Sequence, residues 1–88
     1  MAKNETLENK RKRLIFRSDH RGMKEMDILM GAFAREFIPV LSEEELSQYD
    51  KILDIPDIDL YNWIIGKEQP PANDMNSILK KFLAFKLS

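Results

Sequence analysis

Apolar residues recur along this chain at steps of three and four, the spacing of one face of an α-helix. The clearest run is Met23, Met26, Leu29, Met30, Phe33 and Phe37. Pro39 follows it, and a proline ring disfavours helical geometry at the residue before it. The pattern therefore predicts a helix over about 22–37.

Two more helices are predicted on either side of this run. Thr6 is suited to cap a helix over about 6–17, whose thin apolar stripe is Leu7, Leu14 and Ile15. Residues 18–20 then form a short polar joint. After the proline, Ser42 and Glu45 have the spacing of a capping box, which opens a third helix. Its predicted inward-facing residues are Leu46, Tyr49, Ile52 and Leu53.

The last third of the chain predicts two further helices. One begins near Pro56 and ends at Gly66, a natural C-terminal stop. The other follows a Pro-Pro pair and is capped by Asn73 or Asp74. It carries the apolar residues Met75, Ile78, Leu79, Phe82 and Leu83.

These elements predict an all-α fold, a single small bundle of about five short helices that spans residues 1–88 as one domain. No alternating strand pattern or hairpin turn competes with this interpretation. The composition, 43% hydrophobic and 33% charged, is that of a folded soluble protein. No apolar run approaches the roughly 20 residues that a membrane span needs, so no membrane insertion is expected.

Charge is distributed unevenly along the chain. Residues 1–24 carry a net charge of +5, residues 25–74 a net −9, and residues 75–88 a net +3. Such a pattern can steer association with a partner of matching charge. It can equally reflect basic and acidic helices that attract each other within the monomer. Both interpretations stay open at this point.

The side chains argue against an enzyme. There is no cysteine, His20 is the sole histidine, and the three glycines make no phosphate-binding loop. One histidine beside Asp19 is too little for a metal site. No nucleophile–base arrangement is recognisable by residue type or spacing. We therefore expect no catalytic residue, no metal and no stably bound cofactor.

The segment Arg21-Gly22-Met23-Lys24-Glu25 breaks the rules of the helix that it opens. A glycine inside a helix costs roughly 1 kcal/mol against alanine, and the helix dipole disfavours an arginine at this end. A first-turn carboxylate explains Glu25 by itself, and Arg21 and Glu25 can pair weakly. Arg21 and Gly22 are better explained by a surface on which a second protein approaches the glycine closely and the arginine fork binds an acceptor.

Two blocks of this sequence carry a family resemblance. Arg-Gly-x-x-Glu at 21–25, with its flanks 13–20 and 26–34, resembles the signature of the FAD assembly factors of succinate dehydrogenase, the flavinator proteins. Residues 56–63, Pro-Asp-Ile-Asp-Leu-Tyr-Asn-Trp, resemble a second block of that family. Together they cover roughly residues 11–68, and the C-terminal segment fits least well.

The resemblance implies a helical, non-enzymatic assembly factor that binds the flavoprotein subunit of succinate dehydrogenase, or of fumarate reductase. The client protein would hold the FAD and supply the bond-forming groups. The predicted partner-binding residues are Arg21, Gly22 and Glu25, with Lys24 and His20 at the rim, joined by Met23 and Asp59. A solvated joint is the alternative for His20, and a helix cap the alternative for Asp57 and Asp59.

Other expectations concern the setting. The alternative function is a small helical nucleic-acid-binding domain or another protein-interaction module, although the helices after the first are acidic. We expect a monomer. Early acidic residues and the lack of a serine- and arginine-rich leader favour a bacterial cytoplasmic protein, or a protein of the mitochondrial matrix if the source is eukaryotic.

Overall fold

A computed structural model describes residues 5–85. Within that range the chain forms five α-helices and two short 3-10 turns, and no strand. The elements are α1 (Leu7–Asp19), α2 (Lys24–Phe37), η2 (Ile38–Val40), α3 (Glu43–Leu53), α4 (Asp57–Ile64), η3 (Ala72–Asp74) and α5 (Ser77–Ala84). The predicted all-α bundle is confirmed. No helix in the described range has the length and hydropathy that a bilayer span requires.

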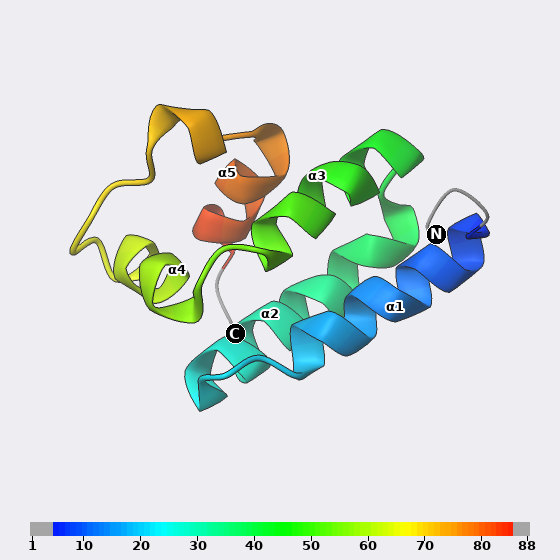
Figure 1. Cartoon of the computed structure of the whole chain (residues 1–88), viewed down its shortest axis with the longest axis horizontal. Coiled ribbons are helices and arrows are strands. Elements are labelled where there is room, and N and C mark those ends of the chain that lie inside the picture. Colours follow the sequence, from blue (N-terminus) through cyan, green and yellow to red (C-terminus); the bar gives the residue numbers. More distant parts are fainter. Residues whose placement is uncertain (1–4, 86–88) are drawn as a thin grey trace.

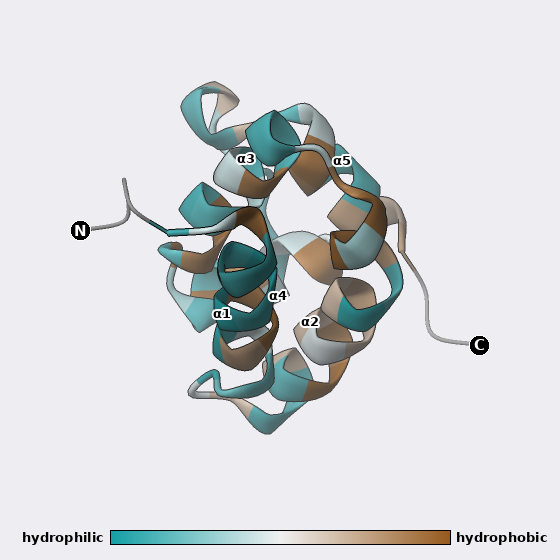
Figure 2. Ribbon diagram, turned by 90° about the vertical axis from the view of Figure 1, so that its right-hand side faces the viewer, coloured by the Kyte–Doolittle hydropathy of each residue, from teal (hydrophilic) through white to brown (hydrophobic). Residues whose placement is uncertain are grey.

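The helices pack around one apolar core. α1 and α2 run antiparallel, α3 packs on α1, and α5 packs on α3 (Figure 1). α1 is mostly hydrophilic, whereas α2 and α5 carry more hydrophobic residues (Figure 2). Phe33 of α2 is fully buried, and its ring lies 5.7 Å from the ring of Tyr49 and 5.2 Å from that of Phe82. The predicted core positions Met26 and Met30 are also buried.

Several predicted helix ends are confirmed. The Thr6 hydroxyl accepts a hydrogen bond from the Asn9 amide, and Ser42 and Glu45 form the reciprocal capping box at the start of α3. Gly66 has a φ of 78°, a left-handed conformation that favours glycine after a helix. Each of these signals involves residues that are close together in the sequence.

Three predicted boundaries were wrong. α2 begins at Lys24 and not at about residue 22, with Met23 as its N-cap, so Gly22 precedes the helix and does not interrupt it. α1 continues to Asp19, because Ser18 occupies a buried position on the inner face and its hydroxyl donates to the Leu14 carbonyl, 2.7 Å away. α5 starts later than predicted. Its cap is Asn76, whose side chain accepts from the Leu79 amide, whereas Asn73 and Asp74 lie in η3.

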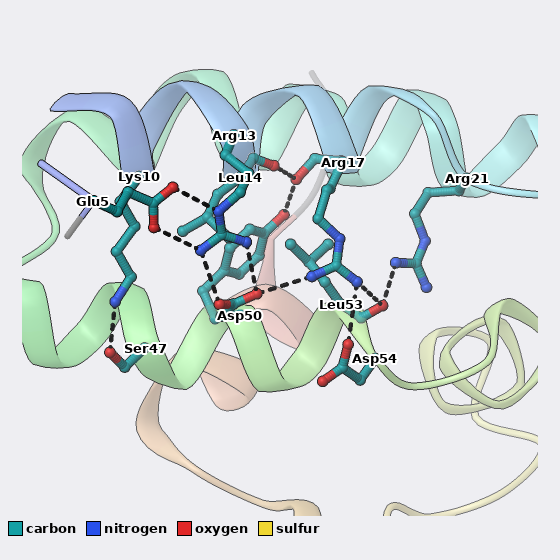
Figure 3. Close-up of polar contacts among 12 residues, drawn as sticks. Glu5, Lys10, Arg13, Leu14, Arg17, Arg21, Ser47, Asp50, Leu53 and Asp54 are labelled. Carbon is teal, nitrogen blue, oxygen red and sulfur yellow. Dashed lines mark hydrogen bonds and ion pairs between the residues drawn. The ribbon is translucent and has the colours of Figure 1, made fainter. Parts of the chain in front are cut away.

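Many of the basic side chains of α1 form ion pairs with acidic side chains of the same chain. Arg13 and Arg17 of α1 both pair with Asp50 of α3, at 3.1 and 2.9 Å, and Arg17 also reaches Asp54 (Figure 3). The hydrogen bond from Arg13 holds the pKa of the Glu5 carboxyl below its usual range. The basic helix and the acidic helix therefore attract each other within the monomer, as one of the two interpretations held.

A buried polar pair joins the same two helices. The Ser18 hydroxyl, which donates to Leu14, lies 2.6 Å from the Tyr49 hydroxyl. Since a serine hydroxyl has a single proton, Tyr49 is the donor in this second bond. Both hydroxyls are thereby satisfied in a part of the core that water does not reach.

Burial of Tyr49 makes the unfolding free energy depend on pH in the alkaline range. Burial raises the pKa of Tyr49 from 10.0 to about 12. The raised pKa means that the stabilisation is complete below pH 10 and is lost as the pH rises from about 10 toward 12. The slope should approach about 1.4 kcal/mol per pH unit in that window. Urea unfolding of the wild type and of Tyr49→Phe at a series of pH values measures this slope.

The variant serves as the reference, because other groups also titrate at alkaline pH in both proteins. We expect the difference in unfolding free energy between the two proteins to shrink or reverse between pH 10 and 12. Two pH profiles that stay parallel across this range would contradict the expected titration of Tyr49.

Candidate partner-binding site

The predicted site lies in the turn between α1 and α2, and the Arg21 side chain there points into the protein. Its Nε donates to the Asp57 carboxylate at 2.6 Å. Its two terminal nitrogens donate to the backbone carbonyls of Leu53 and Ile55, at 2.6 and 2.8 Å. The side chain is only 9% exposed. Arg21 therefore ties the α1–α2 turn to the connection between α3 and α4.

This geometry corrects one expectation. The guanidinium was predicted to offer its fork to a partner or to pair with Glu25. All three of its nitrogens instead bind within the monomer, to Asp57 and to two carbonyls. The physical reason is that the α3–α4 connection presents one carboxylate and two carbonyls at fork spacing, which suits an arginine better than a single glutamate does.

The backbone of the turn is held by carboxylates as well. The Arg21 amide donates to Asp27, and the Gly22 and Met23 amides both donate to one oxygen of Asp57, at 2.6 and 3.0 Å. Amides before and at the start of a helix have no partner within the helix. The Met23 side chain makes no cap bond, and the Asp57 carboxylate binds the backbone amide of Met23, the N-cap residue of α2.

Gly22 has an internal role that the sequence did not reveal. A Cβ atom added at this position would lie 3.2 Å from the nearer Asp57 oxygen, which is tighter than ordinary contact. The missing side chain therefore lets the carboxylate approach the Gly22 amide. Gly22 nevertheless stays exposed on its other side. Arg21 and Gly22, which the sequence analysis explained by a partner surface, therefore also have a role inside the fold.

The other predicted residues lie in different settings. His20, Lys24 and Glu25 are exposed around the turn. Met23 is half-buried and packs against the core. Asp59 is half-buried in the first turn of α4.

A shallow, open hollow of about 390 Å³ adjoins the turn. It is lined by Phe16, Arg17, His20, Arg21, Gly22, Pro56 and Asp57. The Phe16 ring is 63% exposed and stacks on the His20 ring, with centroids 4.0 Å apart. Three of the predicted residues thus meet there, while Lys24, Glu25, Met23 and Asp59 lie outside its lining.

Sequence reasoning did not place the other four lining residues at this site, namely Phe16, Arg17, Pro56 and Asp57. Phe16 lies off the inner face of α1 and four residues before His20, a spacing that allows the two rings to stack. That spacing was a usable signal for Phe16. Asp57 gave no usable signal, because an acid after a proline at a helix start is an ordinary cap. Within residues 5–85, no three acidic or histidine side chains gather in a way that could hold a metal ion.

Comparison with known proteins identifies the family. The family model described as flavinator of succinate dehydrogenase matches residues 12–86. The chain is 40% identical over 74 residues to succinate dehydrogenase assembly factor 2, mitochondrial, of Dictyostelium discoideum, covering 84% of this chain and 52% of the relative. It is 48% identical over 59 residues to the protein of the same name from Scheffersomyces stipitis, covering 67% of this chain and 40% of the relative.

A third relative of that name, from Cryptococcus neoformans, is 44% identical over 62 residues, covering 70% of this chain and 35% of the relative. The chain thus spans between about a third and a half of the length of these relatives. Their names place them in mitochondria, and the bacterial cytoplasm expected for this chain stays a prediction. The family match covers both sequence blocks and all five helices except the start of α1. The chain therefore belongs to the family of flavinators of succinate dehydrogenase.

Proposed function

We propose that this protein is an assembly factor that binds the flavoprotein subunit of succinate dehydrogenase and promotes covalent attachment of FAD to it. The family membership supports the client, and fumarate reductase is a second client to test. FAD and the bond-forming groups belong to the client. The chain acts as a binding partner and not as an enzyme.

One structural observation carries this proposal. The turn that bears the family motif is exposed at Gly22, Lys24 and Glu25, yet its backbone amides are already fixed by carboxylates. A surface that is shaped before a partner arrives loses less conformational freedom on binding. The turn is therefore suited to hold a second protein.

The mechanism follows from binding alone. An assembly factor that prefers the client conformation in which flavin and acceptor side chain are aligned raises the population of that conformation. Each ~1.4 kcal/mol of differential affinity shifts the ratio of the two client states about tenfold. No catalytic group of the chain is needed for this effect.

The test uses covalent flavin as its readout. Gly22→Arg places a long charged side chain on the exposed turn, and Glu25→Ala removes an exposed carboxylate beside it. We expect both variants to lower the covalent flavin of the client several-fold, measured as flavin fluorescence of the denatured flavoprotein subunit. Glu44→Ala is the matched control, because Glu44 is also an exposed glutamate in the first turn of a helix.

Thermal unfolding of each variant separates loss of the surface from loss of the fold. Covalent flavin at the wild-type level with both Gly22→Arg and Glu25→Ala would reject the assignment of this surface. An equal loss with Glu44→Ala would also reject it, since the effect would then follow total charge.

Nucleic-acid binding, the alternative from the sequence, loses support. Arg13, Arg17 and Arg21, three of the basic residues of the N-terminal part, are paired with carboxylates within the chain. A basic surface that binds duplexes needs such side chains clustered and available. We expect no salt-sensitive shift of duplex DNA in a gel.

A further inference from the structure

Asp57 is the hub of the contacts that shape the motif turn. One of its oxygens accepts from the Arg21 side chain, and the other accepts from the amides of Gly22 and Met23. We infer that Asp57 is a positioning residue for partner binding, which sets the shape of the Gly22 turn without itself needing to touch the partner. This inference rests on the proposed function and deepens it.

The Asp57 carboxylate does not cap its own helix. Asp57 is the first residue of α4, yet the N-terminus of α4 has no side-chain cap bond. The carboxylate turns instead toward the start of α2, 34 to 36 positions earlier in the chain. The Asp57 side chain is 14% exposed, so water competes weakly for its oxygens.

Arg21 completes the arrangement from the other side. Besides Asp57, it binds the Leu53 and Ile55 carbonyls, so that the guanidinium spans the whole α3–α4 connection. These bonds join the turn that carries the motif to the turn that follows α3. In this arrangement Arg21 acts on the partner through Asp57 and the turn backbone.

The shape of the turn has a direct bearing on affinity. If only a fraction of free molecules carries the competent turn, the apparent dissociation constant rises by the inverse of that fraction. Asp57→Asn removes the charge that binds both amides and the guanidinium. Should this lower the competent fraction to about one in ten, the affinity falls about tenfold.

The experiment titrates the purified flavoprotein subunit with the full chain and measures the dissociation constant by calorimetry. We expect Asp57→Asn to bind about tenfold more weakly than the wild type, and Asp54→Asn to bind as the wild type does. Asp54 is the matched control because it loses the same charge close by in the chain, and within residues 5–85 its carboxylate pairs with Arg17 at 74% exposure.

Two further readouts separate positioning from simple loss of stability. In the free Asp57→Asn chain, amide exchange of Gly22 and Met23 should speed up several-fold, while exchange in the middle of α2 and α3 stays unchanged. At saturating concentrations of the variant, the extent of flavin attachment should return to the wild-type level, since only the competent fraction has changed.

A double-mutant cycle tests the link between Asp57 and Gly22. Gly22→Ala crowds the carboxylate, so its effect on affinity should be smaller in an Asp57→Ala background than in the wild type. An equal effect in both backgrounds would mean that the partner, and not Asp57, requires the glycine.

The outcomes distinguish the two proposals. If the wild type binds the flavoprotein and Asp57→Asn binds equally well, or loses affinity only in proportion to its unfolded fraction, the role of Asp57 is overturned and the proposed function stands. If the wild type does not bind the flavoprotein, the proposed function fails and the role of Asp57 in it fails as well.

Discussion

Phe33→Ala should be the most damaging single truncation in the core, with a loss of about 3–5 kcal/mol of unfolding free energy. The Phe33 side chain is fully buried. Its ring contacts those of Phe37, Tyr49, Phe82 and Phe85, with centroids 4.8 to 5.7 Å apart. Removal of the ring leaves a cavity at the point where α2, α3 and α5 meet.

For a small domain, whose total stability is typically about 5–15 kcal/mol, this loss is a large fraction of the total. Urea denaturation followed by circular dichroism measures it. Phe16→Ala is the matched control, because it removes the same atoms from a ring that is mostly exposed and should change stability by less than about 1 kcal/mol. Similar losses for the two variants would contradict the core assignment.

Arg21→Leu should cost about 3 kcal/mol, which is far more than an exposed ion pair contributes. The variant leaves the Asp57 carboxylate and the carbonyls of Leu53 and Ile55 without a charged donor in a nearly buried site. A group left in this way keeps its desolvation cost and loses its partner. Chemical unfolding at neutral pH gives the value.

Arg35→Leu supplies the comparison for Arg21. Arg35 pairs with Asp19 at 2.7 Å, but its side chain is 59% exposed, so its removal should cost no more than about 1 kcal/mol. If Arg21→Leu proved equally mild, the guanidinium would be a surface group free to meet a partner, as the sequence alone suggested.

The sequence predicted those parts of the fold that depend on neighbouring residues. Helix periodicity identified Leu46, Tyr49 and Ile52 as inward-facing, and all three are buried. The capping box of Ser42 and Glu45 needs only four consecutive residues, so it could be recognised without the structure.

The boundaries failed where several local signals competed. Ser18 is polar, yet it continues the inner face of α1 because the Leu14 carbonyl and the Tyr49 hydroxyl satisfy it. Before α5, Asn73, Asp74 and Asn76 are all good caps in isolation. Which of them caps α5 was not visible in the local pattern.

The exposure of several predicted partner-binding residues could be read from the sequence, and their role in binding stays a prediction. Gly22, Glu25, Lys24 and His20 are exposed around one turn, as expected. The ion pair between Arg21 and Asp57 joins residues 36 positions apart. The sequence around Arg21 and the sequence around Asp57 give no sign of this pairing. Pairings of this kind depend on how helices pack, which a single sequence does not show.

The ion pair between Arg21 and Asp57 has a practical consequence for anyone who would imitate the motif. The motif Arg-Gly-x-x-Glu is continuous in the sequence. Its conformation, however, is held by contacts with Asp57, Leu53 and Ile55, which lie in a distant part of the chain. A synthetic peptide that copies residues 16–30 would contain every residue of the motif but would lack the contacts that hold its conformation. Grafting this motif onto another scaffold would require transplanting both turns together.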